Sequence, residues 1–437
     1  MKQFRRIKAW LYFHLSKIGH GYFSIRLKID LLFHVFHAVV NYMERIYQSI
    51  IREHFSNNRQ MAFISGPRQV GKTTLSKSID TKYRYLDWDD AQDRMSIIQG
   101  QQYVVDRIGQ QANQLIVFDE LHKYADWKNF VKGLFDKYQE LGWKIIVTGS
   151  SRLDTYRKGG DSLTGRYFHF QMYPLSVAEL LHSNFSEKLI RKPKRLHDDD
   201  WNALLTFGGF PEPFLKANRR FHRQWSRTRQ RQLVQEDIRG LGGGYDISRI
   251  EVLSELIHLN ATTLLNYSAY ARNLRASVES IQRWITLLKQ LSFCFVLRPW
   301  TKNISRSIAK EPKIFLVDWS QIDDTGKRNE NLVACSLLKA VQGWNDLGLG
   351  NFSLQFIRTK EKREVDFVVT DNNQPWFLVE VKTSETRLSP NLEYFQKMLG
   401  AKHAFQATIN LPYQELDYFS IHQPVVVPAR TLLSQLL

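Results

Sequence analysis

The chain has 437 residues, a length that predicts about three domains at roughly 150 residues per domain. Hydrophobic residues make up 43% of it and include 27 Phe, 18 Tyr and 11 Trp, a composition that excludes a disordered chain. Its two cysteines, Cys294 and Cys335, are too few for a disulfide framework or a four-cysteine zinc site, so we expect a reducing compartment, the cytoplasm. The excess of 61 basic over 43 acidic residues, a net charge of +18, favours a polyanionic partner.

Residues 1–57 are interpreted as a basic N-terminal helical extension. Its apolar stretch, LLFHVFHAVV at residues 31–40, is about half of the roughly 20 residues that span a bilayer and is interrupted by two histidines. We therefore expect no integral membrane insertion and no secretory signal. Amphipathic helices that pack on the body of the protein or on another subunit are favoured, and a membrane-surface anchor is the alternative.

A phosphate-binding loop is predicted after the apolar strand MAFIS, which begins at Met61. Residues 66–73, GPRQVGKT, match the pattern G-x-x-x-x-G-K-[ST] between a strand and a helix. The two glycines let backbone N–H groups point at phosphate oxygens, Lys72 would reach the β- and γ-phosphates, and the Thr73 hydroxyl would ligate Mg²⁺. The pattern thus predicts ATP and magnesium as cofactors. The expected binding residues are Gly66, Pro67, Arg68, Gln69, Val70, Gly71, Lys72, Thr73 and Thr74.

Two later apolar strands end in polar residues that suit the same site. LIVFDE at residues 115–120 places Asp119 to hold Mg²⁺ through water and Glu120 to polarise the attacking water. KIIVTGSS at residues 144–151 ends in hydroxyls. Either Thr148 or Ser150 would sense the γ-phosphate or hold the water, and the sequence does not choose between them.

The positive charge is concentrated in residues 1–60 and 211–330. Within the second segment, residues 219–231 hold six arginines and no acid, interleaved with Phe221, His222 and Trp225. Such a density suits a phosphate backbone. The alternative is a solvated helix face whose arginines pair with acids elsewhere.

Residues 248–317 read as three helices followed by two paired strands, the order of a winged helix-turn-helix. Ser277 is a good N-cap for the third helix. Its outward residues would be Glu279, Gln282, Arg283 and Thr286, of which one is basic. Whether this helix contacts DNA or packs against the nucleotide domain therefore stays open.

A second candidate site lies in the last hundred residues. EVDFVV at 364–369, the turn DNNQP and WFLVEVK at 376–382 predict a hairpin that puts Glu380 and Lys382 on one face beside Asp366. Carboxylates about 4–5 Å apart repel each other unless a divalent cation lies between them, which is the basis of the D…E-x-K pattern of restriction-type nucleases. Glu330, near the start of an apolar-striped helix, would add a further acidic ligand. The alternative is a retained fold with a salt-bridged surface cluster.

The segments GPRQVGKTTL, LIVFDELHKY, IIVTGSSRL, SLTGRYFHFQMYPLSVAEL and FGGFPEPFL occur in an order that resembles the AAA-superfamily ATPases whose C-terminal part is a domain of unknown function with a nuclease-like core. The likeness covers about residue 58 to the end. It implies that Gly209-Phe210-Pro211 is a lid motif at adenine and that Arg166 is an arginine finger offered to a neighbouring subunit of a homo-oligomer. An intramolecular salt bridge is the alternative for Arg166.

The expected fold class is α/β. It comprises the extension 1–57, a P-loop AAA-type parallel-sheet ATPase domain at 58–185, a helical lid and linker at 186–247, a winged-helix module at 248–320 and a nuclease-like α/β domain at 321–437. The expected function is Mg²⁺-dependent ATP hydrolysis coupled to conformational change on nucleic acid. The alternatives are an ATP-gated, metal-dependent DNA nuclease and a nucleotide-switched scaffold that binds a protein and cleaves nothing.

Overall fold

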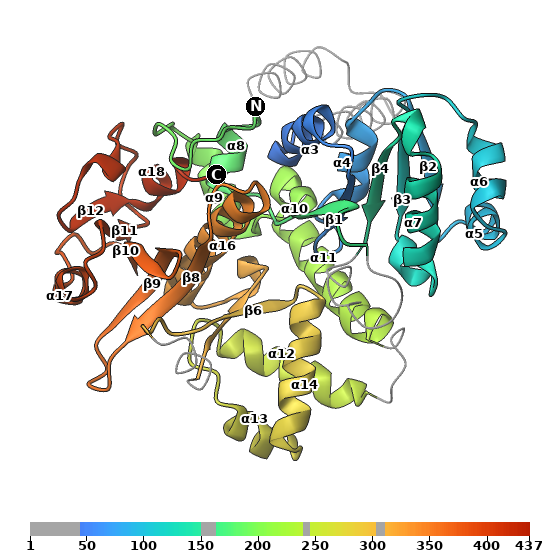
Figure 1. Cartoon of the computed structure of the whole chain (residues 1–437). Helices are drawn as coiled ribbons and strands as arrows, with labels where there is room; N and C mark the ends of the chain where they lie inside the picture. Colours follow the sequence, from blue (N-terminus) through green and yellow to red (C-terminus); the bar gives the residue numbers. More distant parts are fainter. Residues whose placement is uncertain (1–43, 150–162, 239–244, 303–310) are drawn as a thin grey trace, which may run out of the picture.

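The computed structural model of the chain describes residues 44–149, 163–238, 245–302 and 311–437, without the side chains of residues 234–236 (Figure 1). Ser150 and most of the predicted N-terminal extension lie outside these residues. No helix in the described part of the chain is long and apolar enough to cross a membrane.

The part of the chain that is predicted to bind nucleotide is built on a sheet of five parallel strands in the order β2-β3-β4-β1-β5, which confirms the predicted parallel α/β sheet. Alternate residues of β1 enter two different cores. Ala62 and Ile64 share one with α3 and α4, and Met61 and Phe63 share the other with α6 and α7. The elements are α3 (Ile46–Asn57), β1 (Met61–Ser65), α4 (Lys72–Ser78), β2 (Tyr83–Asp87), α5 (Ala91–Ile98), α6 (Gln101–Ile108), β3 (Leu115–Asp119), α7 (Trp127–Lys137), β4 (Lys144–Thr148) and β5 (Tyr167–Gln171).

A run of helices follows the sheet. Pro211 occupies the first turn of α10, where its missing N–H costs nothing, and Asn218 caps α11 by accepting from the amide of Phe221 at 3.0 Å. The helix α11 continues into a π-helical segment, η4 (Gln232–Asp237). The helices are α8 (Val177–Leu181), α9 (Asp198–Phe207), α10 (Pro211–Lys216) and α11 (Arg219–Arg231).

The next part has a core of its own, to which Ile250, Trp284 and Leu316 belong. Ser277 caps α14 as predicted, since its hydroxyl accepts from the amide of Ser280 at 3.1 Å. Three helices precede an antiparallel strand pair, in the order that the sequence predicted; their identity as a winged helix stays a prediction. The elements are α12 (Ile247–Leu259), α13 (Tyr267–Leu274), α14 (Val278–Gln290), β6 (Cys294–Leu297) and β7 (Lys313–Leu316).

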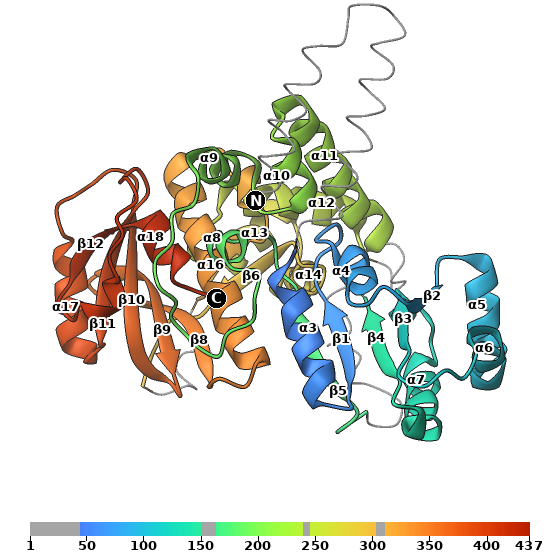
Figure 2. The same cartoon turned by 90° about the horizontal axis from the view of Figure 1, so that it is seen from above.

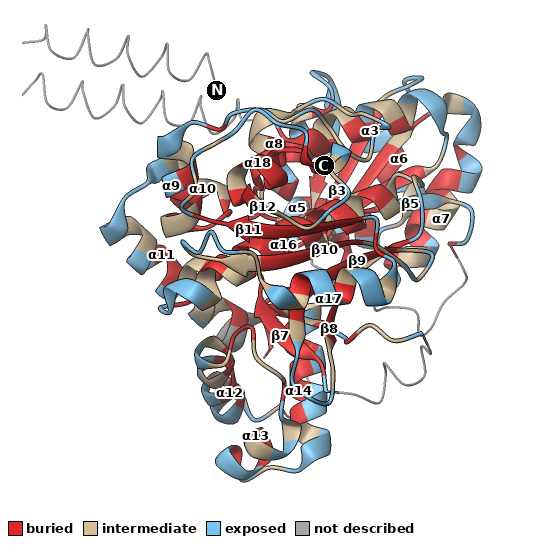
Figure 3. Ribbon diagram, turned by 90° about the vertical axis from the view of Figure 1, so that its left-hand side faces the viewer, coloured by how far each residue is buried: buried red, intermediate tan, exposed pale blue. Residues whose placement is uncertain are grey.

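The C-terminal part is a five-stranded mixed sheet in the order β12-β11-β10-β9-β8, with the buried strands visible in Figure 3. The predicted hairpin is confirmed: β9 and β10 are antiparallel, and Asn372 and Asn373 turn between them at φ 48° and 63°. The helix α16 covers one face of the sheet and α17 the other. The elements are α16 (Thr325–Asp346), β8 (Phe352–Arg358), β9 (Glu364–Asp371), β10 (Gln374–Lys382), α17 (Pro390–Leu399), β11 (His403–Thr408), β12 (Val425–Pro428) and α18 (Ala429–Ser434).

The long helix α16 joins the two sheets. It lies on the side of the C-terminal sheet that faces the nucleotide-binding part (Figure 2), and one hydrophobic cluster includes residues of both parts. At this junction Asp346 of α16 accepts from the backbone N–H of Gln171 in β5 at 3.0 Å. The nucleotide-binding and C-terminal parts therefore share a packed interface.

Candidate functional site

The phosphate-binding loop depends on two glycines in conformations that other residues avoid. Gly66 has φ 151°, and a Cβ there would lie 2.4 Å from the carbonyl oxygen of Met172. Gly71 has φ 101° and directly precedes Lys72, the first residue of α4. The sequence pattern thus corresponds to a tight loop pressed against the chain that follows β5.

The ammonium of Lys72 is held over this loop. It donates to the carbonyl oxygens of Gly66 at 3.1 Å and Pro67 at 3.0 Å. The side chain is buried, and burial lowers the pKa of Lys72. The loop thus holds a buried ammonium in place through two of its own carbonyl oxygens.

Asp119 sits at the end of β3 among three hydroxyls. Its Oδ2 accepts from Thr73 Oγ1 and from the Tyr85 hydroxyl, both at 2.6 Å, and its Oδ1 accepts from the Thr148 hydroxyl. Burial would raise the pKa of Asp119, but these hydrogen bonds outweigh it and hold the pKa below its usual value. The carboxylate is therefore ionised at neutral pH. It lies beside the Thr73 hydroxyl, and these are the two groups predicted to hold Mg²⁺. Tyr85 was not predicted.

Glu120, the next residue, has a left-handed backbone with φ 54°. Such a conformation is costly for a residue with a side chain and is held here by its surroundings. Its amide donates to Thr148 Oγ1 at 3.4 Å, and its carboxylate lies 3.4 Å from Lys123 Nζ and 3.9 Å from His122 Nε2. Thr148 thus contacts both acids, while the other hydroxyl candidate, Ser150, lies outside the described residues.

Lys72, Asp119 and Glu120 line one cavity of about 860 Å³, inside the range of typical ligand sites, and Thr148 is not part of its wall. Pro211 lies in its wall, so the structure brings the predicted lid residue to the predicted phosphate loop. The preceding Gly209 fits closely, since a Cβ there would lie 2.5 Å from the carbonyl oxygen of Leu175. The predicted residues in the cavity wall are Arg68, Gln69, Gly71, Lys72, Thr73, Thr74, Asp119, Glu120 and Pro211.

Arg166 is not part of this wall. Its guanidinium forms two hydrogen bonds with Asp136 of α7, at 2.8 and 2.9 Å, on the exposed surface. This is the intramolecular ion pair that the sequence left as an alternative. A role as an arginine finger between subunits stays a prediction.

The C-terminal carboxylates surround a lysine that the sequence analysis missed. The ammonium of Lys313, a buried residue of β7, lies 3.2 Å from Glu330 Oε1 and 3.8 Å from Asp366 Oδ1, and it also contacts Glu364. Burial would lower the pKa of Lys313, but the three carboxylates raise it. Lys313 comes from β7 and the carboxylates from the following part of the chain, so local sequence carried no signal for this cluster.

The predicted E-x-K pair stands next to the cluster. Lys382 Nζ lies 3.0 Å from Glu380 Oε1, and the amide of Val381 donates to Asp366 Oδ2 at 2.9 Å. The other Glu380 oxygen is buried without a hydrogen-bond partner, and burial raises the pKa of Glu380 to about 7 and that of Glu330 to about 8. Within the described ranges, no group of three or more His, Cys, Asp or Glu residues is arranged to hold a metal ion. The four predicted residues are thus neighbours, but a lysine ammonium lies among the carboxylates.

The arginines of α11 divide between two faces. Arg229 points inward, 3.8 Å from Asp318 and 4.1 Å from the Phe210 ring. On the opposite side lies the arginine stripe, defined as Arg220, Arg223, Arg227 and Arg231, whose spacing places them along one helix face and which are all exposed. None of these four forms an ion pair with the described residues. On α14, the predicted outward residues Glu279, Gln282, Arg283 and Thr286 are all exposed.

Three protein-family models match successive parts of the chain and together cover most of it. Residues 58–181 match a family described as an AAA domain, and residues 198–321 and 325–432 match two domains of unknown function. Residues 58–181, which contain the phosphate loop and the parallel sheet, are thus similar to P-loop ATPase domains of the AAA type. The nuclease-like nature of residues 325–432 stays a prediction.

The relatives with the same overall extent are themselves uncharacterised proteins. MJ1544 of Methanocaldococcus jannaschii is 24% identical over 361 residues, covering 77% of this chain and 78% of its own. A protein of Haemophilus influenzae is 22% identical over 395 residues, covering 82% of this chain and 94% of its own. Rv2008c of Mycobacterium tuberculosis is 20% identical over 339 residues, covering 76% of this chain and 72% of its own.

Solved structures are similar at a coarser level. The Walker-type ATPase paby2304 of Pyrococcus abyssi aligns with a TM-score of 0.37 and 14% identity, covering 64% of this chain and 94% of that one. The Aeropyrum pernix ORC1 protein, solved in complex with DNA, aligns with a TM-score of 0.31 and 13% identity, covering 65% of this chain and 90% of that one. Scores this low carry no functional argument.

Proposed function

We propose that the protein is a Mg²⁺-dependent ATP hydrolase that couples hydrolysis to conformational change on nucleic acid. The observation that carries the proposal is the convergence of Lys72, Thr73 and an ionised Asp119 in one cavity that Pro211 also lines. Loop, cation, hydroxyl and carboxylate are the parts that P-loop enzymes use to position a triphosphate. ATP supplies the transferable phosphoryl group, and Mg²⁺ would neutralise charge on its oxygens.

Each residue then has a defined task. Lys72 binds the β- and γ-phosphate oxygens, and Thr73 and Asp119 hold the metal through the hydroxyl and, by way of water, the carboxylate. Glu120 accepts a hydrogen bond from the attacking water. Thr148 orients the two acids, because its hydroxyl donates to Asp119 and accepts from the amide of Glu120.

A pair of substitutions tests this assignment. Lys72→Ala should abolish hydrolysis and weaken nucleotide binding by more than about tenfold, because the phosphates lose a buried cation. Glu120→Gln should keep binding and lower kcat by about 100-fold or more, because only the water loses its acceptor. Nucleotide binding and phosphate release would be measured on the same preparations.

Matched controls exist for both changes. Lys82 and Glu140 are exposed residues outside the cavity wall, so Lys82→Ala and Glu140→Gln should leave binding and turnover unchanged. Equal loss of binding in Lys72→Ala and Glu120→Gln would contradict the separate roles.

The arginine stripe supports nucleic acid as the substrate on which the ATPase acts. Four exposed guanidinium groups on one helix face, with no ion pair to the described residues, form a surface that a phosphate backbone can neutralise. For the C-terminal part, the ammonium of Lys313 among the carboxylates favours a scaffold that binds without cleaving.

A further inference from the structure

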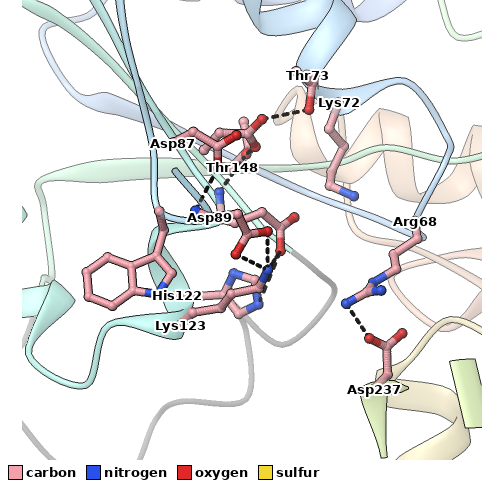
Figure 4. Close-up of polar contacts among 12 residues, drawn as sticks. Arg68, Lys72, Thr73, Asp87, Asp89, His122, Lys123, Thr148 and Asp237 are labelled. Carbon is pink, nitrogen blue, oxygen red and sulfur yellow. Dashed lines mark hydrogen bonds and ion pairs between the residues drawn. The ribbon is translucent and has the colours of Figure 1, made fainter. Parts of the chain in front are cut away.

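Arg68, the third residue of the phosphate loop, is tied to a distant segment. Its guanidinium pairs with the carboxylate of Asp237, the last residue of η4. Figure 4 shows the Arg68 side chain reaching from the loop, beside Lys72, toward Asp237. The side chain of Asp237 is 10% exposed and that of Arg68 is 42% exposed, so the acid is the fixed partner and the arginine reaches to it.

The pair lies at the nucleotide cavity. Arg68 and Lys72 both line it, and Gln232, the first residue of η4, lines it as well. Two cations on one short loop repel each other, and Asp237 is an anion close enough to act on both. The segment η4 thus supplies a negative charge to a loop whose geometry is that of a phosphate site.

We propose that Asp237 stands in for the terminal phosphate of ATP, so that ATP binding transfers Arg68 from Asp237 to that phosphate and releases η4 from the loop. This rests on the proposed function, because it requires that the loop binds ATP. The planar guanidinium fork matches phosphate oxygens at least as well as a carboxylate. Asp237 and the phosphate carry like charge, so both cannot keep Arg68 without repulsion.

Through this exchange, α11 responds to whether ATP or ADP is bound. Because η4 continues α11 without a break, releasing Asp237 removes an ion pair between the phosphate loop and the end of the helix that carries the arginine stripe. ADP lacks the terminal phosphate and leaves the Arg68–Asp237 pair in place. The transfer therefore distinguishes ATP from ADP, which a purely structural ion pair would not do.

The test uses the full chain and two fluorescent ligands, a non-hydrolysable ATP analogue and ADP, with Kd measured by anisotropy. Asp237→Asn should tighten binding of the ATP analogue at least about threefold, the scale of one partly exposed ion pair, and change ADP binding by less than about twofold. Arg68→Gln should weaken binding of the ATP analogue more than that of ADP. Asp106→Asn, at an exposed residue of α6 outside the cavity wall, makes the same charge change and should alter neither Kd.

The outcomes separate the two proposals. If the unaltered chain binds neither ligand, the proposed ATPase function is wrong. If it binds ATP while Asp237→Asn matches Asp106→Asn, weakens binding or shifts ATP and ADP equally, the transfer of Arg68 is wrong and the ATPase function stands. If Asp237→Asn has a lower melting temperature than the unaltered chain, the Arg68→Gln variant is used instead. A larger loss of affinity for the ATP analogue than for ADP supports the transfer, and equal losses overturn it.

Discussion

At the scale of single residues, Glu179 of α8 joins three parts of the chain. Its Oε1 accepts from Arg45 Nε at 2.7 Å, and its Oε2 accepts from the ammonium of Lys339 in α16. Arg45 also donates to the carbonyl oxygen of Val70 in the phosphate loop at 2.7 Å. Burial would raise the pKa of Glu179, but Arg45 and Lys339 lower it to about 2. One carboxylate thus connects the loop to the C-terminal part.

Glu179→Gln should lower the free energy of unfolding at pH 7 by about 3–5 kcal/mol, because Arg45 and Lys339 would stay buried without their anion. The pKa of Glu179 is depressed in the folded state, so its contribution is complete above the unfolded value of about 4.3 and is lost as pH falls toward 2. Denaturant unfolding should show a difference that is present at about pH 5 and shrinks as the pH falls below it. A difference independent of pH down to about 3 would contradict the ionised network.

At the scale of elements, the features that could be predicted from sequence are those determined by residues close together in the chain. The phosphate loop, the acids at the end of β3, the hairpin β9–β10 and the cap of α14 are set by neighbours in the chain, and all were predicted. Asp119 instead receives its Tyr85 hydrogen bond from 34 residues away, and Glu179 meets Lys339 across 160 residues. Such partners are chosen by how whole elements pack, and no local pattern records that choice.

The helix α11 gives the prediction at this scale. If the arginine stripe neutralises DNA phosphates, changing Arg220, Arg223 and Arg227 to Glu should weaken binding to duplex DNA and flatten its dependence on salt. The log-log slope should fall by about 0.9 per lost contact. Fluorescence anisotropy at several ionic strengths would measure it.

A control with the same change in charge is available in the C-terminal part. Lys360, Lys362 and Lys402 are exposed and lie in the connections before β9 and β11, so their replacement by Glu should keep the slope close to that of the unaltered chain. If both triple variants flatten the slope equally, the change is caused by the net charge of the protein, and the arginine stripe is not a DNA-binding surface.

At the scale of the whole molecule, the carboxylate cluster is assembled from two parts of the chain. Lys313 belongs to β7, in the part with its own core, while Glu330, Glu364 and Asp366 belong to α16 and β9. The cation among these acids is therefore supplied by the neighbouring part of the same chain. The ammonium of Lys313 thus offsets part of the buried negative charge without a metal ion.

We expect the unaltered chain to show no phosphodiester cleavage with Mg²⁺ or Mn²⁺. Asp366→Ala should lower the free energy of unfolding by about 1–3 kcal/mol, because a partly buried hydrogen bond from Val381 is lost, and should leave ATP hydrolysis in place. Asp371→Ala, farther along β9, is the matched control and should be nearly neutral. Metal-dependent cleavage that disappears in Asp366→Ala and in Lys382→Ala would instead establish a nuclease.

The buried contacts of Glu179 also bear on how the protein is made. The ribosome produces Glu179 well before its partner Lys339, which comes 160 residues later, and His182 of the same stretch contacts the carbonyl oxygen of Ser434, 252 residues on. At about 5–20 residues per second, the first delay alone is roughly 10–30 s. During that time Glu179 can pair with Arg45 but still lacks its second cation, Lys339, so the buried contacts of α8 stay incomplete until the C-terminal part emerges. The growing chain should therefore stay sensitive to protease until α16 has left the exit tunnel.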